Sequence, residues 1–166
     1  MTATTSVAKA PMKTRKDAPK EKVLVITRLF DAPRSLVFRM WTEPEHLARW
    51  FGCEGSKIIS FERDLHRGGE YRLRMKGADG ADHRLRGVYR EIVPLERLVF
   101  TWANEDADGN LGHETVVTVT LAERGRKTEM TLHHAVFETT EARDLHGEGW
   151  TASLDRLAEY VIKTSA

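Results

Sequence analysis

The 166 residues are enough for one ordinary domain and exclude two enzymes fused in series. The 26 Lys and Arg residues nearly balance 25 Asp and Glu residues, and the formal net charge of +1 gives no support for binding to nucleic acid or to an anionic membrane. Hydrophobic residues at 40% and charged residues at 31% exclude disorder throughout the chain. The single cysteine, Cys53, cannot form an internal disulfide or a multi-cysteine metal site, so we expect a reducing compartment.

Residues 1–22 have the composition of a solvated, disordered tail. Thr, Ser, Ala, Pro and Lys are mixed there without apolar periodicity, and six basic residues stand against two acidic ones. The segment lacks the apolar stretch of a secretory signal, and nowhere in the chain is there a run of about 18 apolar residues that would span a bilayer. We therefore expect a cytoplasmic protein with one domain over residues 23–163.

Two short helices are expected after a first strand at residues 23–30. Asp31 is placed to cap the first helix, over residues 33–41. Thr42 is followed three residues later by a glutamate, which is the pattern of a capping box. The second helix should therefore begin there and end near Trp50.

Alternating apolar and polar residues, broken by turn residues such as those at 77–80, predict an antiparallel meander in the middle of the chain. Leucine, tryptophan and valine then recur at helical spacing over about the last 25 residues. Gly147 and Gly149 lie inside this long helix, where each costs about 1 kcal/mol relative to alanine unless a close approach to the sheet offsets it. The fold class is thus α+β, with a curved sheet of six or seven antiparallel strands around a long C-terminal helix.

Six motifs in this order resemble those of one branch of the START-like, or SRPBCC, superfamily. They are Ile26–Pro33, Trp41–Leu47 with Trp50-Phe51, Gly68–Tyr71, Gly87 leading to Ile92-Val93-Pro94, Arg97–Trp102, and Gly149-Trp150. The branch is the family of proteins homologous to the activator of heat-shock protein 90 ATPase. The resemblance implies a helix-grip fold enclosing an elongated apolar cavity, but no catalytic residues shared across the family. A shared fold does not select a function, because relatives in the superfamily bind lipids and hormones, cyclise polyketides, or contact a chaperone.

The inward rows of the predicted strands, with aromatic residues of the helices, are the candidate walls of a ligand cavity, because such pockets are mainly apolar. The alternative is that these side chains fill the interior against the long helix. The candidates are Trp41, Trp50, Tyr71, Leu73, Met75, Leu85, Tyr89, Phe100, Trp102, Val117, Val119, Met130, Leu132, His134, Trp150 and Leu154.

His134 is the candidate polar anchor among them, because it shares strand parity with Met130 and Leu132. An imidazole there would donate to a ligand carbonyl or act as an acid or base, and the alternative is a histidine hydrogen-bonded at the end of its strand. Tyr71 and Tyr89 are further candidate donors. The other histidines lack the spacing and the carboxylates of a zinc site, and no phosphate loop or dinucleotide fingerprint occurs, so we expect no metal and no cofactor.

Five arginines on neighbouring strands are expected to form an outward basic stripe: Arg72, Arg74, Arg84, Arg86 and Arg90. The stripe is either a solvated face or a surface for an acidic protein partner. Three functions therefore stay open at this point. The first is binding of a small hydrophobic or aromatic ligand without catalysis, the second a cyclase or dehydratase of the polyketide kind, and the third a stress-related adaptor of a chaperone, each as a monomer or homodimer.

Overall fold

Seven antiparallel strands and three helices make up residues 22–165, the part of the chain that the computed structural model describes. The predicted tail therefore lies outside the described residues, apart from Lys22. The strands are Leu24–Phe30 (β1), Lys57–Arg63 (β2), Glu70–Lys76 (β3), Asp82–Val93 (β4), Arg97–Asn104 (β5), Thr115–Arg124 (β6) and Lys127–Ala135 (β7). The helices are Arg34–Thr42 (α1), Pro44–Trp50 (α2) and Thr140–Ser165 (α3). The predicted fold class is confirmed.

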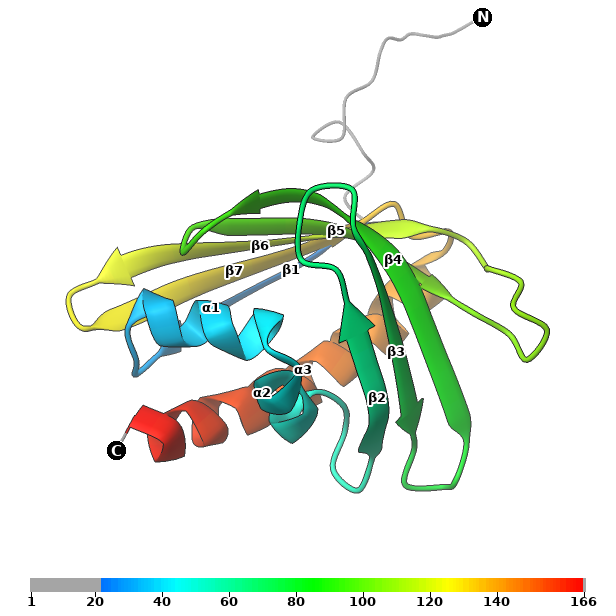
Figure 1. The fold of residues 1–166 in the computed structure, drawn as a ribbon, viewed down its shortest axis with the longest axis horizontal. Helices are drawn as coiled ribbons and strands as arrows, with labels where there is room; N and C mark the ends of the chain where they lie inside the picture. The colour runs from blue at the N-terminus through cyan, green and yellow to red at the C-terminus, as the bar shows by residue number, and fades with distance from the viewer. Residues whose placement is uncertain (1–21, 166) are drawn as a thin grey trace, which may run out of the picture.

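The strands form one sheet in the order β1-β7-β6-β5-β4-β3-β2, so the first strand pairs with the last and β2 is the opposite edge. The sheet curves over α3, and α1 and α2 lie on the same concave side (Figure 1). Of the short helices, α1 contacts β6, β7 and α3, whereas α2 contacts α3 and β2. The concave face near β3 to β5 is therefore covered less fully than the face near β6 and β7.

Side chains alternate between the two faces of the sheet, as expected for strands with one buried face. Tyr71 and Leu73 on β3 are buried, while the arginines between and beside them are exposed. Leu73 lies directly opposite Leu85 on β4, and Tyr71 lies opposite Gly87. These cross-strand pairs build an apolar inner wall from residues far apart in the sequence.

The long helix α3 buries one face against this wall. Trp150, Leu154, Leu157 and Val161 recur every three or four residues and are at most 3% exposed. A Cβ added at Gly147 would lie 3.3 Å from a methyl carbon of Leu24, so glycine lets α3 approach β1 closely. In the part of the chain that is described, no helix is both long and apolar enough to cross a membrane.

Both predicted helix caps are wrong. Pro33 occupies the N-cap position of α1 and Glu43 that of α2, and neither helix has a hydrogen bond from a capping side chain. The Thr42 hydroxyl instead donates to the carbonyl oxygen of Phe38 over 3.0 Å, inside the last turn of α1. Pro44 opens α2, and its fixed φ suits a first helical position without a side-chain cap.

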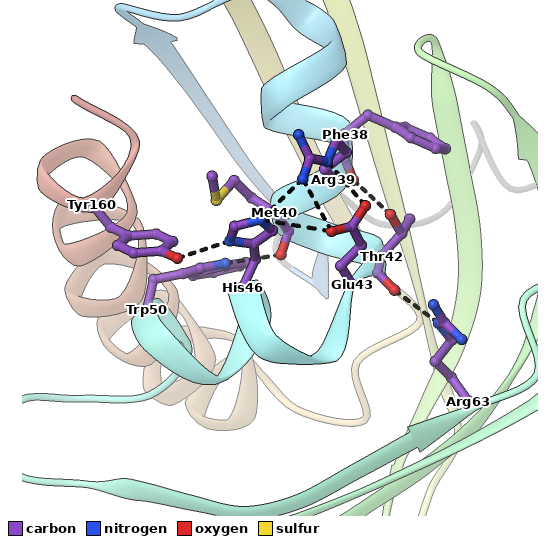
Figure 2. Close-up of polar contacts among 9 residues, drawn as sticks. All are labelled: Phe38, Arg39, Met40, Thr42, Glu43, His46, Trp50, Arg63 and Tyr160. Carbon is purple, nitrogen blue, oxygen red and sulfur yellow. Dashed lines mark hydrogen bonds and ion pairs between the residues drawn. The ribbon is translucent and has the colours of Figure 1, made fainter. Parts of the chain in front are cut away.

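Polar contacts join α1 to α2 and α2 to α3, and Figure 2 shows them. The indole Nε1 of Trp50 donates to the carbonyl oxygen of Met40 over 3.0 Å. Nδ1 of His46 and the hydroxyl of Tyr160 share a hydrogen bond of 2.8 Å between α2 and the end of α3. These contacts fix the helix that carries Trp41, whose ring lies at the interior of the domain.

Candidate functional site

The space between the sheet and the helices is divided into a small inner cavity and an open cleft beside it. The inner cavity has a volume of about 30 Å³, which is about the share of one water molecule in the liquid. Eight predicted site residues line it: Trp41, Tyr71, Leu73, Leu85, Tyr89, Phe100, Trp102 and Trp150. Aromatic rings thus fill most of the centre, where the sequence predicts the main hollow.

The cleft has a volume of about 610 Å³, within the range usual for ligand pockets. The first turns of α3, the loop after α2 and the ends of β3, β4 and β5 surround it. Four predicted residues, Met75, Leu85, Trp102 and Trp150, belong to its lining. The last three also line the inner cavity, so the two spaces share an aromatic wall.

Several cleft residues were missed by the sequence analysis: Phe51, Gly52, Cys53, His83, Asn104, Leu145, His146, Glu148, Gly149 and Ser153. Most lie on loops or in the glycine-containing first half of α3. The two glycines in the first half of α3 were the sequence feature that indicates this cleft. A glycine within a long helix keeps side-chain volume out of the adjacent space. A Cβ at Gly149 would meet no atom within 4 Å, whereas one at Gly147 would meet Leu24.

Seven predicted site residues line neither space and belong to the packed core: Trp50, Val117, Val119, Met130, Leu132, His134 and Leu154. Each is at most 1% exposed. Most of them lie on β6 and β7, where α1 packs against the sheet and takes the available volume. The space therefore lies at the β3 to β5 side of the expected hollow.

His134 is fixed in one neutral tautomer by its neighbours. Trp150 Nε1 donates to His134 Nδ1 over 3.0 Å, which leaves the ring proton on Nε2. That proton points to the hydroxyl oxygen of Thr115 at 2.7 Å, and the Thr115 hydroxyl donates to the carbonyl oxygen of Trp102 over 3.0 Å. Both imidazole nitrogens are thus used within the protein.

Burial lowers the pKa of His134 to about 2, with smaller contributions from His146 and His133. The unfolded chain binds a proton near pH 6.5 whereas the folded chain does not, so stability should fall as the pH drops below 6.5. We expect the wild type to lose about 1.4 kcal/mol per pH unit between pH 6 and 4 relative to His134→Gln, which has no titrating group there. Urea unfolding of both proteins across this range checks the slope, and parallel pH profiles would contradict it.

The two tyrosines of the inner cavity remain protonated at neutral pH. Burial raises the pKa of Tyr71 well above its ordinary value and that of Tyr89 to about 12. The Tyr71 hydroxyl donates to the carbonyl oxygen of Thr101 over 2.6 Å, so it fixes β3 to β5 instead of pointing to a ligand. The phenols offer packing surface and no anionic group.

The arginines of the predicted stripe lie on the convex side, and four of the five pair with carboxylates. The pairs are Arg74 and Arg84 with Asp82, Arg86 with Glu70 and Glu105, and Arg90 with Glu114, at N to O distances of 3.0 to 3.6 Å. These pairs neutralise much of the stripe. The acidic protein partner stays a prediction.

The described residues contain no group of three or more His, Cys, Asp or Glu side chains placed to hold a metal ion. Cys53 is exposed and lines the cleft. His146, on α3, donates from Nδ1 to the carbonyl oxygen of Ala142 over 2.8 Å, so its Nε2 carries the lone pair in the neutral ring. The cleft therefore combines apolar walls with a few polar groups, among them the side chains of Glu148 and His146.

Comparison with known protein families gives one match over most of the chain. The family model described as Activator of Hsp90 ATPase homolog 1-like protein matches residues 31–162. A search of the curated proteins finds no match.

Solved structures share the fold at moderate sequence identity. Protein CV1439 of Chromobacterium violaceum is 28% identical with a TM-score of 0.77, covering 84% of this chain and 96% of its own. The AHSA1 protein SPO3351 of Silicibacter pomeroyi is 26% identical with a TM-score of 0.77, covering 86% and 99%. CalU16 of Micromonospora echinospora is 28% identical with a TM-score of 0.64, covering 84% and 75%.

Proposed function

The chain belongs to the family of Activator of Hsp90 ATPase homolog 1-like proteins, and from this premise we propose that it binds a small apolar or aromatic molecule in the cleft beside α3. The observation that carries the proposal is the open volume of about 610 Å³ next to a wall of aromatic rings. Burying apolar ligand surface there contributes about 25 cal/mol for each Å² removed from water. Binding requires no catalytic group.

The aromatic wall offers flat surfaces at stacking distance from one another. The ring of Trp102 lies 5.2 Å from that of Trp150 and 5.9 Å from that of Phe51, measured between centroids. Phe51 and Trp150 are 5.8 Å apart and nearly perpendicular. A planar ligand inserted from the cleft would extend this cluster of edge-to-face and tilted contacts, each worth about 0.5–1.5 kcal/mol beyond the area it buries.

The charge of the cleft favours an uncharged ligand. Its lining contains no Lys or Arg side chain, and Glu148 is its one carboxylate. An anionic ligand would meet no fixed positive charge there, and burial of an unpaired charge is expensive. A polyketide-type cyclisation would need an acid or base at the substrate. His134, the candidate from the sequence, lies outside both spaces with its nitrogens already bonded, so this role would fall to the titratable groups of the cleft lining, such as His146 and Glu148.

Leucine at position 149 should block binding without unfolding the protein. Gly149 lines the cleft and has open space where a side chain would begin, so a leucine side chain would enter the volume a ligand needs. We expect Gly149→Leu to weaken binding of the neutral fluorescent probe N-phenyl-1-naphthylamine at least about tenfold, equivalent to about 1.4 kcal/mol. Fluorescence titration measures the loss.

Gly149→Ala is the matched control, because a methyl group reaches only a short way into the cleft. It should keep probe binding within about twofold and raise the free energy of unfolding by about 0.5–1 kcal/mol through better helix propensity. Absence of saturable probe binding by the wild type, or equal binding by Gly149→Leu, would overturn the cleft as the binding site.

A further inference from the structure

The four tryptophans differ in how their indole N–H groups are used. Those of Trp50 and Trp150 donate within the protein, to Met40 and His134. The Nε1 atoms of Trp41 and Trp102 are buried and have no hydrogen-bond partner among the described residues. A buried donor without an acceptor destabilises a protein by about 1–3 kcal/mol, so this division needs a physical reason.

The two unpaired donors belong to the same wall. Trp41 is 4% exposed and lines the inner cavity. Trp102 lines both the inner cavity and the cleft, at the boundary between them. Trp150 lines both spaces as well, but its N–H is occupied by His134. The side chains that carry unpaired donors are thus those at the inner end of the proposed binding site.

The rest of the inner lining supplies no acceptor to these donors. Apart from the tryptophans it consists of leucine, phenylalanine and two tyrosines, and the Tyr71 hydroxyl already donates to Thr101. An acceptor for the indole N–H groups would have to come from a bound molecule, either water or a ligand that replaces it.

Resting on the proposed binding function, we propose that the site selects an aromatic molecule that carries a neutral carbonyl group, whose oxygen accepts a hydrogen bond from Trp102 Nε1. A carbonyl oxygen satisfies the donor without bringing a charge into an apolar lining that holds no Lys or Arg. A cation would pair with Glu148 but would leave the indole donors without an acceptor. Trp41 Nε1, deeper in the wall, offers a second donor to a ligand oxygen that reaches into the inner cavity, whose volume of about 30 Å³ admits no larger group.

The test compares 1-tetralone with tetralin, a hydrocarbon of nearly the same shape. We expect wild-type protein to bind the ketone about tenfold more tightly, which corresponds to one hydrogen bond that satisfies a buried donor. In nitrogen-15 spectra of the tryptophan side chains, the ketone should shift the Trp102 indole proton downfield while the Trp50 signal stays in place. The carbonyl stretching band of bound tetralone should move to lower frequency than in hexane.

Substitution by phenylalanine removes the N–H and keeps an aromatic ring. Trp102→Phe should reduce the preference for the ketone to within about twofold of unity. Trp50→Phe is the control, since Trp50 lines neither space and its N–H donates to the carbonyl oxygen of Met40, and it should keep the preference. Both comparisons use the ratio of two affinities, so a general loss of packing cancels.

The outcomes separate this inference from the function on which it rests. Binding of neither compound would overturn the binding function itself. Equal affinity for both compounds, with an unshifted Trp102 indole signal, would leave the cleft as a binding site and overturn carbonyl selection. Because the affinities and spectra are measured on the wild type, they decide for or against carbonyl selection even if Trp102→Phe does not fold.

Discussion

Replacing His134 by alanine should lower the free energy of unfolding by about 3–5 kcal/mol. The side chain is fully buried, so its removal leaves a cavity in the core between β7 and α3. The substitution also removes the acceptor of the Trp150 N–H and the donor to the Thr115 hydroxyl oxygen. Both groups would then be buried without that hydrogen bond. Equilibrium unfolding in urea at pH 7.5, where the His134 imidazole is mostly neutral in both the folded and the unfolded chain, gives the difference.

His134→Gln separates the hydrogen bonds from the ring. The amide of glutamine carries one acceptor and one donor group, as the neutral imidazole does, so it should recover at least about half of the loss seen with alanine. A loss below about 1 kcal/mol for His134→Ala would contradict the buried chain of hydrogen bonds from Trp150 to Thr115. Equal losses for the two variants would assign the effect to packing alone.

The strands were predictable from the sequence because each buries one face along its length. The alternation of Tyr71 and Leu73 with arginines is a local pattern, and it gave the correct inward rows on β3. Parity also placed His134 correctly among buried residues of β7. Its partner Trp150, however, lies on α3, and no spacing in the sequence reveals that pairing.

The predicted cap of α2 failed because the Thr42 hydroxyl has a competing partner. Thr42 satisfies a carbonyl of the preceding helix, and Pro44 makes a side-chain cap at the start of α2 unnecessary. The position of the open space was also beyond sequence reasoning. That position depends on where α1 packs on the sheet. Because α1 covers β6 and β7, the residues of these strands are enclosed, whereas those near Trp102 lie beside a cleft.

No pattern in the sequence predicts which indole N–H groups of the site lack a hydrogen-bond partner. Trp41 and Trp50 both lie near the ends of short helices, yet the N–H of Trp50 is hydrogen-bonded and that of Trp41 is not. The difference arises because Met40 presents its carbonyl oxygen to Trp50 across the junction of α1 and α2, as Figure 2 shows. Hydrogen-bond satisfaction is decided by tertiary contacts, and the ligand chemistry inferred from it requires the folded structure.

A methyl group at Gly87 should destabilise the domain by about 3 kcal/mol or more, at the upper end of the cost of overpacking. A Cβ built there would overlap the carbonyl oxygen of Thr101 on the neighbouring strand and lie 2.5 Å from Cε2 of Tyr71. The strand cannot retreat freely, because the Thr101 hydroxyl accepts a hydrogen bond from the backbone N–H of Val88 and its carbonyl accepts one from Tyr71. Urea unfolding of Gly87→Ala measures the loss.

Gly112→Ala is the matched control, because the nearest atom to its added Cβ is the Asn104 carbonyl oxygen at 3.7 Å, an ordinary contact. Its free energy of unfolding should stay within about 0.5 kcal/mol of the wild type. Comparing the stabilities of the two variants tests how the cavity wall is built. The ring of Tyr71 crosses Gly87 to reach β5, and its hydrogen bond there holds the inner lining in place. If Gly87→Ala were as stable as Gly112→Ala, β4 and β5 would have to separate more easily than their hydrogen bonds allow, and the aromatic wall would not be the rigid surface that selective binding requires.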